Sequence, residues 1–251
     1  MNIAERQPVF EVKDICYSYN NQIVALDHVS LEVWSGEILA ILGSNGSGKS
    51  TLLKILDGLY YATSGMVKAF GHEISESTLG NEQFNYQFRS RVGFVFQDSD
   101  VQLFMPSVWD EVAFAPLQMG IEHKEVITRV EAALQVLKIL KLKDRAPHQI
   151  SGGEKKRVAL ASILSLSPEV WLLDEPSAGL DPRSVSWLVE FIREQGRTGK
   201  TIVLATHDLK LVESLATRVY VLSEEHHVVA EGNPGQILAD TSMLMDSNLT
   251  R

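Results

Sequence analysis

The sequence predicts an α/β fold with a mixed β-sheet, and three observations lead to that prediction. The short apolar run Glu37–Leu42 is typical of a buried strand, and a glycine-rich loop and the helical start Thr51–Leu56 follow it. Before this unit, Val29–Trp34 alternates apolar and polar side chains, as a half-buried antiparallel strand does. After it, apolar runs of strand length alternate with helical segments, the order expected of a parallel sheet.

Composition limits the class of protein. The 251 residues suffice for one large domain or two small ones, and 45% of them are apolar, as in a globular protein. A net charge of -9 argues against a nucleic-acid partner, which requires a basic surface. The single cysteine, Cys16, fits a reducing compartment. No run approaches the ~18 apolar residues of a membrane span, and the polar residues 1–8 are not expected to be a signal peptide.

The loop at residues 43–50 has the sequence Gly-Ser-Asn-Gly-Ser-Gly-Lys-Ser, which matches the phosphate-binding pattern G-x-x-x-x-G-K-[ST]. Its glycines let backbone N–H groups approach phosphate oxygens, and the N-terminus of the following helix adds partial positive charge. Lys49 is expected to reach the β- and γ-phosphates, and the Ser50 hydroxyl is expected to hold Mg²⁺. The sequence therefore predicts a nucleotide-binding loop.

Strands are also expected at Val9–Val12 and Met66–Phe70, on either side of this unit. The polar residues Gly71–Arg89 show no clear period and are expected to form a loop. Tyr17 and Tyr19 have two interpretations. They are either ordinary strand aromatics, the more frequent case, or an aromatic face that stacks on a nucleotide base.

A strand is expected at Arg91–Phe96, and the segment Asp98–Pro106 after it combines acidic and apolar residues. One interpretation of this segment is a solvated connector. The other is a contact surface, because Leu103, Phe104 and Met105 are costly to leave in water.

Ser107–Lys143 is predicted to be a helical insert within the α/β pattern. Ser107 suits a helix N-cap, and apolar residues recur at helical spacing from Glu125 to Lys141. A further helix is expected from Ile150–Glu154 to about residue 166. Ser151 and two glycines in front of this helix suit an anion, although an ordinary capping turn with Ser151 as N-cap is the better explanation when they are considered alone.

The apolar run Val170–Glu175 ends in two carboxylates. Such acids are usually solvated, but a phosphate-binding loop makes Asp174 a candidate to hold Mg²⁺ at the carboxyl end of its strand. The strand Thr201–Thr206 is followed by His207, which falls where the sheet edge should face the phosphates. A lone histidine is nevertheless more often structural than catalytic.

The remaining elements follow from the same patterns. A turn at residues 177–182 precedes the predicted helix Ser184–Gln195. The strand Arg218–Leu222 is expected to form a hairpin with His227–Glu231. Met243–Arg251 is expected to be weakly ordered.

These motifs, in this order, resemble those of the ATP-binding cassette (ABC) ATPases over residues 9–239. No single motif is decisive, but the ordered set is highly specific. The signature departs from the commonest form, Leu-Ser-Gly-Gly-Gln, because Ile150 and Glu154 replace its first and last residues, and Glu154 adds a negative charge near the nucleotide. The matches are the Walker A loop at 43–50, the Q-loop at Gln97, the signature at 151–154, Walker B and its following glutamate at 170–175, the D-loop at 177–181, the H-loop at His207 and the base-stacking aromatic at Tyr19.

The resemblance implies an α/β P-loop NTPase cassette with an antiparallel β subdomain and a helical subdomain inserted between the Q-loop and the signature. It implies one nucleotide-binding domain at 1–251, with the helical subdomain at about 100–165. It also implies ATP and Mg²⁺ as ligands, and two cassettes head to tail with ATP between the Walker A loop of one and the signature of the other. The implied nucleotide-binding residues are Tyr19, Gly43, Ser44, Asn45, Gly46, Ser47, Gly48, Lys49, Ser50, Thr51, Ser151, Gly152, Gly153 and Glu154. The implied metal-binding residues are Ser50, Gln97 and Asp174, and the implied catalytic residues are Glu175, His207 and Gln97, with Glu175 as the general base.

A narrower resemblance joins Phe94–Phe104, Val108–Pro116 and Ser151–Leu160 to the ATPase component of energy-coupling factor importers, which take up cobalt, nickel or vitamins. Ser99 stands where a proline is usual. This resemblance implies integral membrane partners that contact about Asp98–Phe114, and a peripheral position on the cytoplasmic face of the membrane. The second cassette is either a copy of this chain or a relative.

Two alternatives are an ABC transporter of another class and a soluble ABC ATPase of translation or DNA repair. The soluble class usually has two cassettes in one chain, long coiled-coil insertions or a basic surface, and this sequence has none of these. A nucleotide kinase or GTPase would have no use for the signature.

Overall fold

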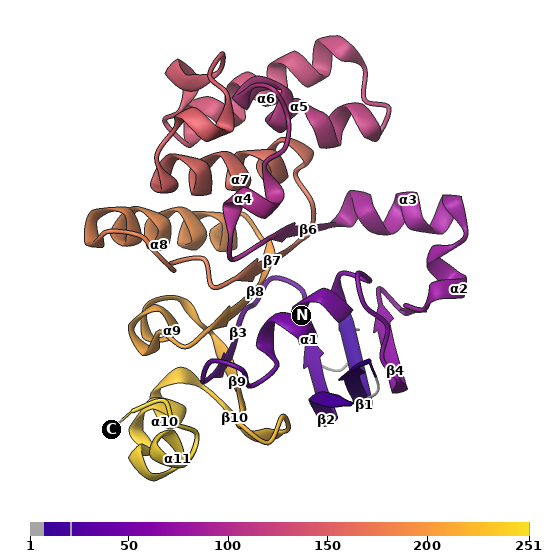
Figure 1. Cartoon of the computed structure of the whole chain (residues 1–251), viewed down its shortest axis with the longest axis vertical. Helices are drawn as coiled ribbons and strands as arrows, with labels where there is room; N and C mark the ends of the chain where they lie inside the picture. Colours follow the sequence, from indigo (N-terminus) through magenta and orange to yellow (C-terminus); the bar gives the residue numbers. More distant parts are fainter. Residues whose placement is uncertain (1–7, 21, 251) are drawn as a thin grey trace.

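The computed structural model describes residues 8–20 and 22–250, and the strands in this part of the chain form two separate sheets (Figure 1). The larger sheet has the strand order β10-β9-β3-β8-β7-β6, and its neighbouring strands are parallel apart from the antiparallel pair β9 and β10. The predicted hairpin of these two strands is therefore confirmed. The strands are β3 (Ile38–Gly43), β6 (Val92–Val95), β7 (Val170–Asp174), β8 (Thr201–Thr206), β9 (Arg218–Leu222) and β10 (Val228–Gly232).

The smaller sheet is antiparallel, with the order β2-β1-β4-β5. The antiparallel strands before the phosphate-binding loop therefore form a sheet of their own, the antiparallel β subdomain that the resemblance implied, and the large sheet is mixed only through β10. Helix α1 (Lys49–Leu56) explains the separation, because its buried leucines and isoleucine join apolar side chains of both sheets in one cluster. The strands are β1 (Phe10–Tyr19), β2 (Ile23–Val33), β4 (Ser64–Ala69) and β5 (His72–Glu73), so the first two are longer than predicted.

The other helices cover the large sheet. Helices α5, α6 and α7 form the group at the top of Figure 1, and their apolar faces pack with α8, β7 and β8 in a second core cluster. Residues of α9, α10 and α11 contribute to a third cluster against β3 and β9. Their bounds are α5 (Val108–Gln118), α6 (His123–Val136), α7 (Gly152–Leu166), α8 (Pro182–Arg197), α9 (Leu209–Leu215), α10 (Pro234–Ala239) and α11 (Thr241–Asp246), with 3-10 turns η2 (Leu140–Leu142) and η3 (Pro147–Gln149).

The predicted loop at Gly71–Arg89 was wrong, because the segment contains the short helix α2 (Glu76–Leu79) and most of α3 (Glu82–Arg91). The side chain of Asn81 caps α3 by accepting a hydrogen bond from the backbone N–H of Phe84. Only one side chain of α3, Phe88, is fully buried, so the helix leaves almost no apolar period in the sequence.

Two further predictions need correction. Asp98–Pro106 contains the helical turn α4 (Ser99–Gln102), and Leu103 is only 8% exposed, whereas Phe104 is 66% exposed. The predicted weakly ordered tail contains most of α11, and Leu244 packs in the third core cluster. Residues 1–7 of the predicted polar N-terminus and residue 251 lie outside the described part. Within residues 8–20 and 22–250, no helix combines the length and apolar character needed to cross a membrane.

A buried carboxylate joins α1 to α3. Asp57 is 5% exposed, and Nη1 of Arg89 donates to its Oδ2 atom at 2.9 Å and to its carbonyl oxygen at 2.7 Å. Burial raises the pKa of Asp57 from 3.8 to about 7, and the neighbouring Arg89 only partly opposes the shift. Between these two pH values the folded state holds a proton that the unfolded state has lost, so stability falls as pH rises through this window.

We therefore expect the wild type to lose stability relative to Asp57→Asn as pH rises from 4 to 8, by up to about 4 kcal/mol. The asparagine cannot ionise, so it removes this contribution from the pH dependence. Urea unfolding of both proteins at several pH values measures the difference. Parallel pH profiles for the two proteins would show that Asp57 keeps an ordinary pKa.

Candidate nucleotide-binding site

A pocket of ≈ 450 Å³ opens beside the loop that follows β3. Parallel strands bring the residues that follow them to one sheet edge, and β3, β8, β7 and β6 are successive neighbours in the sheet. The pocket accordingly collects side chains from segments far apart in the sequence. Its walls are formed by Tyr19, Ile23, Ala25, Asn45, Gly46, Gly48, Lys49, Ser50, Thr51, Gln97 and Glu175.

The backbone of the loop requires glycine next to the helix. Gly48, the N-cap of α1, has a φ of 104°, and a Cβ atom there would lie 2.1 Å from the carbonyl oxygen of Ala25. Gly46 also has a positive φ, of 88°, and a Cβ there would meet nothing within 4 Å. The bare backbone thus leaves room for a ligand to approach the amides at the start of α1, an arrangement suited to phosphate.

Lys49 is 5% exposed and folds over this loop. Its Nζ atom donates to the carbonyl oxygens of Gly43 at 2.9 Å and Ser44 at 2.8 Å, and it lies 3.5 Å from Oε1 of Glu175. Burial lowers the pKa of Lys49, while the carboxylates of Glu175 and Asp174 act to raise it. A buried cation is therefore held at the loop, where it can neutralise phosphate charge.

A hydroxyl and a carboxylate meet on the other side of the loop. Oγ of Ser50 donates to Oδ1 of Asp174 at 2.8 Å, and Asp174 is 3% exposed. Burial raises the pKa of Asp174, and the hydrogen bond from Ser50 opposes this. Mg²⁺ prefers oxygen ligands of this kind, and Gln97 lines the same pocket with a further amide oxygen, so the residues fit a magnesium ion.

Glu175 lies directly after β7 in a strained backbone conformation, with a φ of 41°. Its Oε1 atom is 2.9 Å from Nδ1 of His207, and its Oε2 atom accepts a hydrogen bond from the hydroxyl of Thr206 at 3.3 Å. Left-handed backbone at a non-glycine residue costs about 1–3 kcal/mol and is concentrated at functional sites. The strain and the two bonds fix a buried carboxylate toward the pocket, with His207 beside it.

An aromatic side chain borders the pocket opposite these carboxylates. The hydroxyl of Tyr19 is 2.8 Å from Oγ1 of Thr51, and its ring contacts Tyr17 edge to face at 5.1 Å. Ile23 and Ala25 line the pocket near Tyr19, and the sequence analysis did not identify either. Ile23 is 67% exposed, a large apolar side chain left in water beside an aromatic ring. The proximity of this residue to the predicted aromatic Tyr19 is the sequence signal that could have found it.

Three of the predicted loop residues do not line the pocket: Gly43, Ser44 and Ser47. Asp174 and His207 do not line it either, but their side chains are hydrogen-bonded to Ser50 and Glu175, which do. Gly43 ends β3, and Ser44 donates its hydroxyl to Oε1 of Glu224 at 3.3 Å. The hydroxyl of Ser47 is buried, and the described residues provide no hydrogen-bond partner for it. These loop residues therefore support the conformation of the loop without facing the pocket.

The four signature residues also lie apart from the loop. Ser151 caps α7, and a hollow of ≈ 170 Å³ joins Gly152 to Gln97 and to the turn at Ala178–Leu180. Oε2 of Glu154 accepts hydrogen bonds from the backbone N–H and the hydroxyl of Ser151, both at 2.9 Å. The N–H bond lowers the pKa of Glu154. The capping turn considered from sequence is therefore present, and within one chain the signature does not meet the phosphate-binding loop.

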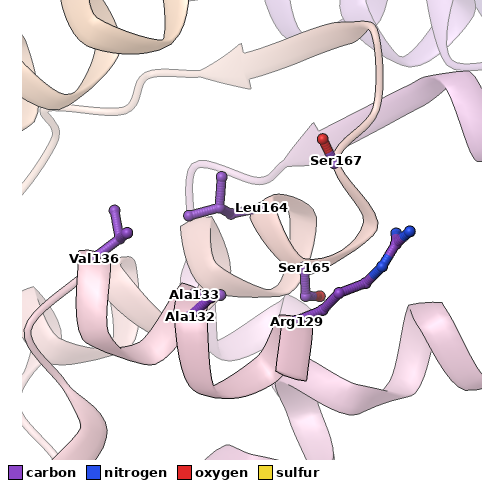
Figure 2. Close-up of a pocket in the computed structure, with 7 residues that line it drawn as sticks. All are labelled: Arg129, Ala132, Ala133, Val136, Leu164, Ser165 and Ser167. Atoms are coloured by element: carbon purple, nitrogen blue, oxygen red, sulfur yellow. The ribbon is translucent and has the colours of Figure 1, made fainter. Parts of the chain in front are cut away.

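A different pocket lies between α6 and the C-terminal part of α7 (Figure 2). Its volume is ≈ 350 Å³, and its walls are mainly alanine, leucine and valine side chains. The only charged residue in the wall, Arg129, is paired with Glu125 through Nε at 2.8 Å. The 15-residue helix α7 separates this pocket from Ser151 by about 20 Å. Because its one arginine is already paired and no glycine-rich loop borders it, this pocket is a weaker candidate for a nucleotide than the one beside residues 43–50.

One possible metal-ligand group lies outside the nucleotide pocket. Cys16, Asp27 and His28 each bring a ligand atom within 4.8 Å of the others. Asp27 and His28 are exposed, and Nδ1 of His28 already lies 2.8 Å from Oδ1 of Asp14. Such exposed groups are common in proteins without an ion, so the cluster receives no functional assignment.

Comparisons with known proteins agree with this geometry. The model of the family described as "ABC transporter" matches residues 26–178. A protein of Methanosarcina acetivorans named "Putative ABC transporter ATP-binding protein" is 50% identical over 244 residues, which cover 96% of this chain and 88% of that protein. The nickel import ATP-binding protein NikO of Rhodobacter capsulatus is 43% identical over 245 residues, which cover 96% of each protein.

Solved structures show the same fold. CbiO1 from Clostridium perfringens, described as part of the ABC transporter complex CbiONQ, is 36% identical with a TM-score of 0.81, over 96% of this chain and 95% of that chain. The dimeric structure of MJ0796, described as a bacterial ABC transporter cassette, is 26% identical with a TM-score of 0.80, over 90% of this chain and 98% of that chain.

Proposed function

Because the chain belongs to the ABC transporter family and is the ATP-binding subunit of an ABC transporter, we propose that it powers an energy-coupling factor importer of cobalt, nickel or a vitamin. The chemistry of the family is ABC-type ATP hydrolysis. The full-length similarity to CbiO1, a component of CbiONQ, carries the proposal of the importer type. The similarity to the nickel import protein NikO supports it.

The pocket residues divide into groups by the part of the nucleotide they would contact. Tyr19 would stack on the base, next to the exposed apolar side chain of Ile23. The amides of residues 43–51 and the ammonium of Lys49 would hold the phosphates. Ser50, Asp174 and Gln97 would hold Mg²⁺, which supplies positive charge to the phosphate oxygens when it is bound.

Hydrolysis requires a water molecule aimed at the γ-phosphate. Glu175 would accept a proton from this water, because its carboxylate lines the pocket and is oriented by Thr206 and His207. His207 would steady the γ-phosphate and the water through its other ring nitrogen. Gln97, which follows the neighbouring parallel strand β6, would contact the metal or the water from the same sheet edge.

A second cassette would complete the site. Ser151, Gly152, Gly153 and Glu154 are separated from the phosphate-binding loop within one chain, which supports their action on the ATP of the partner. The dimeric cassette MJ0796 is a precedent for such pairing. ATP would favour the closed dimer because only that state makes both sets of contacts, and hydrolysis would remove the preference. Asp181, the N-cap of α8, would tie the two cassettes together.

We further propose that residues 1–251 act as one nucleotide-binding domain, with the helical subdomain at about 100–165. The membrane partners would contact about Asp98–Phe114. Phe104 is the best candidate in that range because it is 66% exposed, and its ring contacts Phe114 edge to face at 5.2 Å. The cassette would therefore sit at the cytoplasmic face of the membrane through its partners.

Capture of the chain from detergent-solubilised native membranes tests this function. Integral membrane proteins that co-purify and stimulate ATP hydrolysis are the expected result, and their identity would indicate the substrate. Recovery of ribosomes or DNA-bound proteins would leave the ATPase chemistry intact and overturn the transport function. An unrelated set of membrane subunits would place the chain in another class of ABC transporter.

Phe104→Ser is expected to reduce this capture by about tenfold, the equivalent of 1.4 kcal/mol. The change removes an aromatic side chain that solvent already reaches, so the fold should be retained. Val136→Ser is the matched control, because Val136 is 51% exposed on α6 and lies outside the proposed contact. Equal capture of both variants would exclude Phe104 from the membrane contact.

A further inference from the structure

Lys156 is a buried cation that the nucleotide chemistry above leaves without a role. It lies in the first turns of α7, five residues after the signature serine, and is only 3% exposed. Its Nζ atom donates to the carbonyl oxygen of Gln97 at 2.9 Å and to that of Phe96 at 3.1 Å. The signature helix is thus bonded directly to the residue proposed to contact Mg²⁺ or water.

Burying the Lys156 ammonium costs free energy, because the group loses its hydration. Burial lowers the pKa of Lys156, and the carboxylates of Asp174 and Asp98 only oppose that shift. Its hydrogen-bond partners are carbonyl groups rather than a carboxylate, so the dipoles of these carbonyl groups offset much of the lost hydration. Buried charges are often replaceable by apolar residues without loss of stability. A role in positioning explains the lysine better than a role in stability does.

A second side chain, that of Gln102, binds the backbone of the same residue, Phe96, through its N–H group. Oε1 of Gln102 accepts a hydrogen bond from the backbone N–H of Phe96 at 3.1 Å. Nε2 of Gln102 donates to the carbonyl oxygen of Ala159 at 3.4 Å and to the hydroxyl of Ser162 at 3.3 Å, both on α7. Both polar groups of the Phe96 backbone are therefore bound by side chains linked to α7.

From these contacts we infer that Lys156 is a positioning residue that makes the Q-loop and the signature move together. This inference rests on the proposed head-to-tail dimer. In that dimer, Gln97 faces the ATP on its own chain, whereas Ser151 faces the ATP on the partner. Lys156 therefore links the two ATP sites through a single chain. ATP bound at the first site would move Gln97, and the hydrogen bond from Lys156 to Gln97 would then move the signature toward the second ATP site.

The test uses Lys156→Met in a Glu175→Gln background, in which ATP is bound but not consumed. The two measurements are ATP-induced dimerisation by sedimentation and ADP binding by fluorescence of a labelled nucleotide. The variant is expected to need at least about fivefold more ATP for half-maximal dimerisation, the lower end of typical coupling between sites. ADP binding should change by less than about twofold, because Lys156 does not line the nucleotide pocket.

Lys200 provides a matched control. Its Nζ atom also bridges two successive carbonyl oxygens, those of Ser167 at 2.9 Å and Pro168 at 2.7 Å. This bridge lies beyond the C-terminus of α7 rather than at its signature end. Lys200→Met therefore removes the same kind of contact and is expected to leave dimerisation within about twofold of the parent.

The outcomes are distinct. Dimerisation of Lys156→Met at the parental ATP concentration would overturn the positioning role, even if the melting temperature fell. If Lys156→Met does not fold, Lys156→Gln replaces it. The glutamine side chain keeps an N–H donor but is one bond shorter than lysine, so the same rise in the ATP concentration for half-maximal dimerisation is expected. A parent that does not dimerise with ATP would overturn the proposed dimer and the inference with it. The behaviour of the parent thus separates that failure from a failure of Lys156 alone.

Discussion

Replacing Glu175 by glutamine is expected to lower ATP turnover at least about a hundredfold while ATP binding is retained. Glu175 is 4% exposed, and contacts with Thr206 and His207 orient its two carboxylate oxygens. Glutamine has nearly the same shape, but it cannot serve as the base that accepts a proton from water. The lost negative charge lies 3.5 Å from Nζ of Lys49, so the loop becomes more positive and ATP affinity is not expected to fall.

Trapped ATP gives this prediction a second readout. In the proposed head-to-tail dimer, the closed state would be favoured as long as ATP makes contacts that only this state provides, and hydrolysis would end that condition. The glutamine variant should therefore accumulate as a dimer on size-exclusion chromatography with ATP, and remain a monomer with ADP. Phosphate release measures the loss of turnover in parallel.

Glu169→Gln is the matched control for this substitution. Glu169 immediately precedes β7, whereas Glu175 directly follows the opposite end of the same strand. Its carboxylate is paired with Arg91 at 2.8 Å on the protein surface, far from the pocket. Turnover close to wild type is expected for Glu169→Gln. Full turnover in Glu175→Gln would remove Glu175 from the role of general base.

The nucleotide pocket was largely predictable because it depends on local patterns that share one geometric rule. Buried parallel strands have continuous apolar sequences, and the polar residues that follow them meet at one edge of the sheet. Asp174 ends such a strand, and Lys49, Glu175 and His207 each follow one within a few residues. The strand order, which the sequence analysis did not predict, places β3, β8 and β7 side by side and so brings these residues together.

Other features depend on tertiary contacts that leave no periodic pattern of apolar residues in the sequence. Leu103 was expected to be exposed beside Phe104, but the hydrogen bonds of Gln102 hold that turn against α7, and Leu103 is buried. Ile23 follows a turn and shares no motif with the phosphate-binding loop, so apart from its proximity to Tyr19 nothing in the sequence marks it for the pocket wall. Lys156 lies in a run of charged residues typical of a solvated helix face. Its burial depends on the position of the Q-loop.

Lys49→Ala is expected to weaken ATP binding by about a hundredfold, within the range for removing one partner of a buried, hydrogen-bonded charge pair. The ammonium is the only positive group among the residues that line the pocket. Without it, the carboxylates of Asp174 and Glu175 would face the phosphates with no compensating cation, and repulsion would add to the lost attraction. Equilibrium binding of ATP, measured at fixed salt and magnesium concentrations, gives the change directly.

Lys54→Ala controls for the loss of positive charge on the same helix. Lys54 is half-buried, lies five residues further along α1 and does not line the pocket, so its removal should change ATP affinity by less than about threefold. The geometry makes the comparison informative, because Nζ of Lys49 is bonded here to the carbonyl oxygens of Gly43 and Ser44. Equal ATP affinity in Lys49→Ala and Lys54→Ala would mean that Lys49 keeps those carbonyl bonds when ATP is present. The backbone amides alone would then hold the phosphates, and the lysine would serve to shape the loop.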